Sequence, residues 1–160
     1  MKRIIAIVVL VLIGCGNVEN TTPLPDTIQN MKLHEVTQGE EADQVITQMH
    51  RKPVTDQKSY IGEYRGKEYQ ATLYLTIYSN PESAIQDLEQ MTERIRDPQI
   101  GGQMGYQHVR GLDSYGENVY MALQNRRAHY FYVIDRHLYW LDANPHVGMA
   151  ALKELLGKPA

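Results

Sequence analysis

The sequence predicts a single α+β domain, built from an antiparallel sheet of about six or seven strands packed by three amphipathic helices. Runs in which apolar and polar residues alternate, as in half-buried strands, are interleaved with runs whose apolar residues recur at helical spacing. The links between successive strand-like runs have the length of hairpin turns, which favours antiparallel pairing. A chain of 160 residues has room for one such domain with a buried core.

The first half of the domain starts at about Met31. Thr37 and Glu40 form a capping box, and the apolar residues that follow lie on one helical face until Pro53 ends the helix. Two strand-like runs come next, separated by a short turn centred on Gly66. We therefore expect a strand at about 31–36, a helix from about 40 to 52, and two hairpin strands at 58–64 and 69–79.

The run at 69–79 shows the clearest strand pattern in the sequence. Its aliphatic residues occupy every second position, from Ala71 to Ile77, and alternate with threonines and tyrosines, from Thr72 to Tyr78. Successive side chains of a strand point to opposite faces of the sheet. One face of this strand is therefore expected to meet the core, while the other carries hydroxyl groups and aromatic rings.

A second helix should begin at Asn80-Pro81, with asparagine as the N-cap and proline in the first turn. Its apolar stripe runs from Ala84 to Ile95, and Asp97-Pro98 ends it. Leu88 lies at the centre of this stripe, so it is expected to face the sheet with Leu73 and Leu75.

The rest of the chain follows the same rules. Several glycines predict a mobile loop up to about Gly105, and Asn144-Pro145 repeats the helix-start signal. Turn-forming residues divide the segment between them into short antiparallel strands. We expect strands near 106–111, 117–124, 128–135 and 137–142, and a last helix from Pro145 to Gly157.

The first fifteen residues have the layout of an export signal. Lys2 and Arg3 precede the apolar run Ile4–Ile13, which is too short to span a membrane because a transmembrane helix needs about 20 apolar residues. The sequence Leu12-Ile13-Gly14-Cys15 resembles the lipobox of bacterial lipoproteins. This resemblance implies cleavage before Cys15, lipid modification of Cys15, and residues 1–14 as a signal peptide. An uncleaved membrane anchor or an ordinary secretory signal is the alternative.

The expected organisation is a lipidated cysteine and flexible linker at 15–30, rich in Asn, Thr and Pro, followed by one globular domain at 31–160. The lipoprotein resemblance implies a cell-envelope location, at the outer membrane if the organism has two membranes and otherwise on the outer face of the cytoplasmic membrane. Losing Lys2 and Arg3 changes the formal charge from −3 to about −5, which argues against nucleic acid as a partner. The element order after Met31 weakly resembles PsbP-like α/β/α lipoprotein domains, which implies a fold but no function.

No catalytic, metal or cofactor site is expected from the sequence. The six histidines form no HExxH or HxH motif, and Cys15 is the one cysteine. Four histidines have a methionine nearby, so a soft-metal (copper) or haem-handling lipoprotein is one alternative. No serine lies in a glycine-rich nucleophile elbow, and a small hydrolase with an unrecognised site is the other alternative.

Tyrosine is the most suggestive residue type, with eleven tyrosines against one phenylalanine. Tyr74 and Tyr78 share one strand face, and Tyr130 and Tyr132 share another. Burial of these rings beneath helices is the simpler expectation, and an aromatic contact surface for a partner is the alternative. Together these observations predict a lipid-anchored envelope lipoprotein that is not an enzyme and that serves as a binding or assembly module for an envelope protein.

Overall fold

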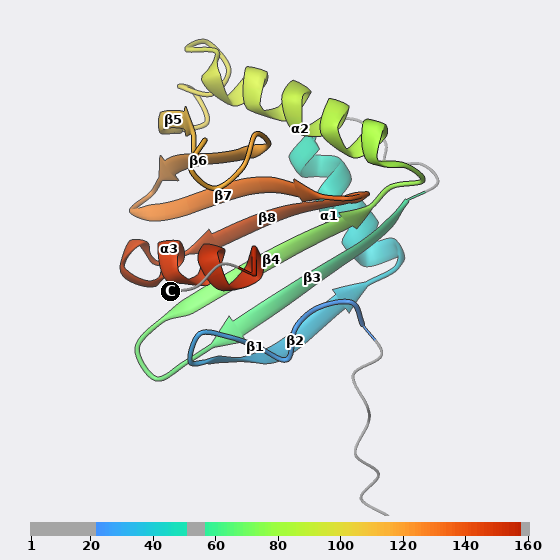
Figure 1. Ribbon diagram of the computed structural model, residues 1–160, viewed down its shortest axis with the longest axis vertical. Coiled ribbons are helices and arrows are strands. Elements are labelled where there is room, and N and C mark those ends of the chain that lie inside the picture. Colours follow the sequence, from blue (N-terminus) through green and yellow to red (C-terminus); the bar gives the residue numbers. More distant parts are fainter. Residues whose placement is uncertain (1–21, 51–56, 158–160) are drawn as a thin grey trace, which may run out of the picture.

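The computed structural model describes residues 22–50 and 57–157. They form one antiparallel sheet of eight strands and three helices (Figure 1), which confirms the predicted α+β class. No helix in these two ranges is long and apolar enough to cross a membrane. The strands are β1 (Thr27–Ile28), β2 (Met31–Gln38), β3 (Lys58–Arg65), β4 (Gln70–Ile77), β5 (Gln107–Gly111), β6 (Val119–Gln124), β7 (Arg127–Ile134) and β8 (His137–Ala143), and the helices are α1 (Glu40–His50), α2 (Pro81–Arg96) and α3 (Pro145–Leu155).

The sheet order is β1-β2-β3-β4-β8-β7-β6-β5, so two meanders that follow one another in the chain meet along β4 and β8. Cα pairs along this seam run from Ala71 with Ala143 to Ile77 with His137. Tight turns connect most neighbouring strands within each meander. Between β6 and β7, Asn125 and Arg126 both have positive φ angles, of 50° and 63°, as a type I′ hairpin turn requires.

The helices cover both faces of the sheet (Figure 1). Helix α3 packs on one face, against β7, β8 and β1, whereas α1 and α2 lie on the other, with α1 on β2 and β3 and α2 on β7, β8 and β5. We call these the α3 face and the α1–α2 face. Each face has its own apolar core, in which alternate residues of the same strands take part.

Helix α2 begins and ends where the sequence predicts, but it packs on the face of the sheet opposite to the one that carries Leu73 and Leu75. Asn80 is its N-cap, and the Asn80 side chain accepts a hydrogen bond from the Ser83 backbone N–H at 2.8 Å. Leu88 is fully buried, yet it belongs to the core of the α1–α2 face, whereas Leu73 and Leu75 point to the α3 face. The expected contact of Leu88 with these two leucines is therefore wrong.

The segment 22–30 is part of the folded domain and not of a flexible linker. Leu24 and Ile28 are buried in the core of the α3 face, and β1 pairs with β2. The Tyr64 hydroxyl donates a hydrogen bond to the Pro25 carbonyl at 2.9 Å. The linker boundary at residue 30 is thus wrong for these residues, and β1 is the strand that the sequence did not predict.

Candidate functional site

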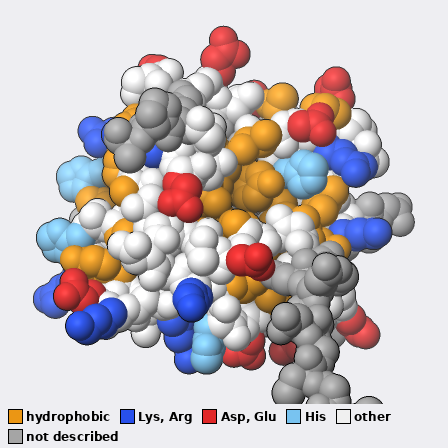
Figure 2. All heavy atoms as spheres, turned by 60° about the horizontal axis from the view of Figure 1, so that its bottom comes forward, with side chains coloured by type: hydrophobic (Ala, Val, Ile, Leu, Met, Phe, Trp, Pro, Cys, Tyr) orange, Lys and Arg blue, Asp and Glu red, His pale blue; other side chains and the backbone are white. Residues whose placement is uncertain are grey.

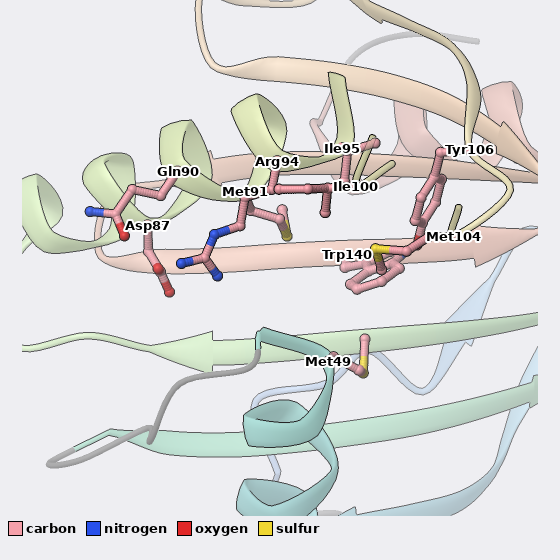
Figure 3. Close-up of a pocket in the computed structure, with 10 residues that line it drawn as sticks. All are labelled: Met49, Asp87, Gln90, Met91, Arg94, Ile95, Ile100, Met104, Tyr106 and Trp140. Carbon is pink, nitrogen blue, oxygen red and sulfur yellow. The ribbon is translucent and has the colours of Figure 1, made fainter. Parts of the chain in front are cut away.

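A pocket opens between α1 and α2 on the α1–α2 face of the sheet (Figure 3). Its walls come from both helices and from the segment after α2, and part of its floor comes from β8. The lining combines thioethers and aromatic rings with a few polar groups. These residues are Met49, Asp87, Gln90, Met91, Arg94, Ile95, Ile100, Met104, Tyr106 and Trp140.

The sequence of α2 and its C-terminal turn explain how this wall forms. Residues at 87, 90, 91, 94 and 95 follow helical spacing, so they lie on one side of α2. The chain then folds back, because the Gly101 N–H bonds to the Asp97 carbonyl at 2.7 Å and the Tyr106 N–H to the Gly101 carbonyl at 2.9 Å. A Cβ atom on Gly101 would lie 1.8 Å from the carbonyl oxygen of Ile95, so this reversal requires glycine.

Aromatic rings continue from the pocket into the sheet beneath it. The Trp140 ring centroid lies 4.9 Å from that of Phe131, 5.5 Å from that of Tyr74 and 5.8 Å from that of His129. Tyr106 makes an edge contact with His129 at 5.5 Å between centroids. Rings in such tilted and edge contacts stabilise one another, so the floor is a firm surface beneath the side chains of α1 and α2.

Among the histidines whose burial the structure describes, His129 alone is buried. Its Nδ1 accepts a hydrogen bond from Trp140 Nε1 at 3.0 Å, which requires that Nδ1 carry no proton. Burial lowers the pKa of His129, and the nearby Arg127 lowers it further, whereas Asp142 opposes this shift. The ring is therefore neutral at pH 7, with its proton on Nε2.

A second buried polar contact lies at the other end of the pocket. The Tyr78 hydroxyl donates a hydrogen bond to Oδ2 of Asp87, which joins the end of β4 to α2. Burial and this hydrogen bond raise the pKa of Tyr78. Burial also raises the pKa of Tyr106, with a further contribution from Asp142. Both phenols therefore stay protonated at neutral pH, and neither can act as a base or as a charged ligand there.

The size of the pocket limits what it can hold. Its volume is about 40 Å³, far below the roughly 300–1,000 Å³ of sites that enclose a small molecule. Met49, Met91 and Met104 are each half-buried, and methionine side chains adapt easily to a new neighbour. The pocket can accordingly accept one apolar side chain or a small ion, and it widens if the methionines move.

The described residues include no group of three His, Cys, Asp or Glu side chains that could hold a metal ion. The pocket itself contains three soft donors, the thioethers of Met49, Met91 and Met104, which come from α1, α2 and the loop after α2. Cys15, the predicted lipidation site, lies outside the described residues.

The four tyrosines proposed as an aromatic contact surface do not form one. Tyr130 and Tyr132 are buried in the core of the α3 face, and Tyr78 is buried beneath α2. Tyr74 is half-buried, and its ring makes a tilted contact with that of Trp140. The alternative of a shared, exposed surface is therefore wrong, and burial beneath helices, the simpler expectation, describes these rings. Helices cover both faces of the sheet, so the alternating residues of β7 are buried on both sides.

The sequence did not indicate the residues that line the pocket. Met91 stands on the predicted apolar stripe of α2, where it was expected to be core. Nothing in the sequence places Met49, Met104 and Trp140 beside it, since they lie in three other segments. The glycines at 101, 102 and 105 were the available signal, because they marked a sharp change of chain direction after α2.

No protein-family model, curated protein or solved structure matches this chain.

Proposed function

We propose that this chain is a lipoprotein, attached through Cys15 to the outer side of a membrane, whose domain is a non-catalytic binding module. Its binding site is the pocket between α1 and α2, which takes an apolar side chain of a protein partner in the cell envelope. The observation that carries this proposal is the lining of the pocket, in which half-buried methionines surround an aromatic floor (Figure 3).

The composition of the pocket supports a protein partner. Methionine, tyrosine, tryptophan and arginine are enriched in the centres of protein interfaces, and all four occur here. Ile100, at the rim, is 38% exposed and is one of two large hydrophobic residues that are exposed in the described chain. A volume of about 40 Å³ suits one inserted side chain better than a free metabolite.

The position of the pocket also supports this proposal. The segment 22–28, which leads from the anchor into the domain, packs on the α3 face. The pocket lies on the α1–α2 face, on the opposite side of the sheet. A tether on one side leaves the other side open to a partner.

Site-specific photo-crosslinking in the producing cells tests this function. A photoreactive amino acid at Ile100 is expected to give a discrete protein adduct, whereas the same residue at Lys67, an exposed turn position away from the pocket, is not. Met104→Asp, which places a charge in the pocket, should abolish the Ile100 adduct while leaving the circular dichroism spectrum unchanged. Equal adducts at both positions, or none at Ile100, would contradict a partner site at this pocket.

One observation favours a second candidate function, the handling of a soft metal ion. Three thioethers line the same pocket, and thioether ligands select Cu(I). Competition of the protein with a chromophoric Cu(I) chelator tests this function. Met49→Leu, Met91→Leu and Met104→Leu, which nearly conserve volume, should each weaken binding about tenfold or more, whereas Met149→Leu on α3 should not. Absence of Cu(I) binding, or equal binding by all four variants, excludes this candidate.

A further inference from the structure

Three neighbouring strands end side by side next to the first described residues of the chain. Lys58 in β3 pairs with Ile77 in β4, and Ile77 pairs with His137 in β8, so these three residues form a row across the sheet. Residues that are paired in this way point to the same face of the sheet. A groove of about 420 Å³ lies between this end of the sheet and the segment at Thr22 and Pro23.

The groove has cations at its rim and half-buried rings and aliphatic groups inside. Lys58 and Arg136 are both exposed, and neither takes part in an ion pair among the residues that the structure describes. Tyr60 and Ile77 are half-buried between them. No carboxylate lines the groove, although Asp135 stands next to Arg136 in the turn between β7 and β8. This combination fits an anionic partner that also offers apolar contact.

A neighbouring groove extends this surface on the α3 face. It has a volume of about 410 Å³, and it shares Thr22 and Pro23 with the first groove. One carboxylate lines it, that of Glu154, which accepts hydrogen bonds from the backbone N–H and the side-chain amide of Gln29. Tyr139, half-buried, stacks between Tyr132 at 4.9 Å and His137 at 6.2 Å. Figure 2 shows hydrophobic side chains gathered in the middle of the side that it presents. Tyrosines with one apolar and one wet side are typical of membrane–water interfaces.

The length of chain between anchor and domain restricts which part of the domain can reach the membrane. Cys15 and Thr22 are seven residues apart, so even a fully extended chain spans at most about 25 Å. A domain of this size is on the order of 35 Å across. The end that contains Thr22 therefore stays near the membrane surface, and the opposite end cannot reach it without the domain turning over.

We propose that the end of the sheet around Lys58, Tyr60 and Arg136 docks on the anionic headgroups of the membrane that holds Cys15. This inference rests on the proposed function, because it requires the lipid anchor. Weak binding of headgroups by this groove is sufficient, since the anchor already keeps the groove at a high effective concentration near the headgroups. The mature chain carries a net negative charge, so an anionic membrane surface repels most of the domain. This repulsion favours the orientation in which Lys58 and Arg136 face the headgroups.

The reactivity of lysines in the mature, lipidated protein tests this proposal. The protein is inserted from detergent into preformed vesicles of phosphatidylglycerol and phosphatidylcholine, and a membrane-impermeant acetylating reagent is applied. Lys58 begins β3 and Lys67 lies in the turn after its other end, and both are exposed. The length of the strand separates them by more than about 20 Å, so Lys67 is the internal control. Mass spectrometry is expected to show at least about fivefold slower acetylation of Lys58 than in detergent, and an unchanged rate at Lys67.

Two arginine variants separate the docking surface from general charge. Arg136→Gln should remove most of the protection of Lys58. Arg126→Gln, in the turn at the other end of β7, should leave this protection intact. Equal effects of both variants overturn the proposal, and so does equal acetylation of Lys58 and Lys67 on the vesicles.

Four further results distinguish the alternatives. Equal protection of Lys58 on vesicles of phosphatidylcholine alone would overturn the choice of an anionic surface. Protection by inorganic phosphate in detergent would make the groove a site for soluble anions and would overturn membrane docking. If intact mass shows no lipid on Cys15, the proposed function fails first. If the lipidated protein floats with vesicles while Lys58 stays reactive, only the docking proposal fails.

Discussion

At the scale of single residues, the contact between His129 and Trp140 constrains the chemistry of the α1–α2 face. Trp140 can only donate at Nε1, so it keeps Nδ1 of His129 free of a proton. Arg127 forms an ion pair with Asp142, and His129 Nδ1 lies 4.0 Å from the same Asp142 oxygen. The Asp142 carboxylate is thus paired with Arg127 and does not hold a proton on His129. The histidine is therefore a neutral aromatic ring in the floor of the pocket.

This neutral histidine predicts a dependence of stability on pH. The pKa of His129 is lowered by burial below the unfolded value of about 6.5, so the unfolded chain takes up a proton first as the pH falls. The contribution is fully present above about pH 6.5 and is lost on acidification from there toward the lowered pKa, with a slope of at most about 1.4 kcal/mol per pH unit. Urea unfolding between pH 7.5 and 5 should show this loss.

His129→Gln should flatten that pH dependence, because the glutamine oxygen can accept from Trp140 without titrating. His146→Gln is the matched control, since His146 is exposed, and it should keep the slope of the unmodified protein. An identical slope in the His129 variant and the unmodified protein would show that other groups cause the pH dependence.

Leu88 tests the packing of α2 on the sheet. It is fully buried, so Leu88→Ala should lower the free energy of unfolding by about 2–5 kcal/mol through lost contacts and a residual cavity. Ile134, which is 42% exposed, provides the control, and Ile134→Ala should change the free energy of unfolding by no more than about 0.5 kcal/mol. Equal, small losses in both variants in chemical denaturation would place this side of α2 in solvent.

At the scale of secondary-structure elements, the N-terminal segment differs most from its prediction. Its composition of Asn, Thr and Pro is typical of a spacer, yet Leu24 and Ile28 fill the core of the α3 face. A Cβ on Gly62 would approach the Leu24 side chain to 3.0 Å, which shows how closely this segment lies against β3. These two side chains, the pairing of β1 with β2 and the hydrogen bond from Tyr64 to Pro25 hold the segment in place.

Leu24→Ala should therefore destabilise the fold by about 2–5 kcal/mol, as other buried Leu→Ala changes do. Thr27→Ala, at an exposed position of β1, should cost no more than about 0.5 kcal/mol. Thermal or urea unfolding of the two variants decides between a packed segment and a spacer. A Leu24 variant as stable as the Thr27 variant would restore the spacer interpretation.

At the scale of the whole molecule, the sheet separates two functions in the proposed arrangement. The segment that leads to the anchor lies on the α3 face, and the methionine-lined pocket opens on the α1–α2 face. The seam between β4 and β8 holds the two halves together, since seven residue pairs join these strands. In the proposed arrangement, the end of the sheet next to Thr22 lies near the membrane, while the pocket on the α1–α2 face is open to a partner.

The anchor itself is tested by mass spectrometry of the mature protein. The N-terminal peptide is expected to begin at Cys15 and to carry a mass increment of two or three acyl chains, because a single chain holds a protein only marginally. Cys15→Ser should give unprocessed precursor or a released form. An N-terminal peptide that carries an unmodified cysteine, or that starts elsewhere, would refute the lipoprotein proposal.

The sequence by itself determined most of the local structure. Both Asn-Pro pairs are helix starts, and their asparagine side chains accept backbone N–H groups as predicted. The three helices and seven of the eight strands lie where periodicity and turn residues placed them. These signals are local, because caps, prolines and the spacing of apolar residues act within one or two turns of chain.

Only the tertiary structure decided which elements meet. Alternation in β4 shows that the strand has two faces, but it does not tell whether α2 or α3 covers the face with Tyr74 and Tyr78. That choice depends on strand order and on how both cores fill, and these are properties of residues far apart in the chain. The pocket has the same origin, since Met49, Met104 and Trp140 meet there only because α1 and α2 share one face of the sheet.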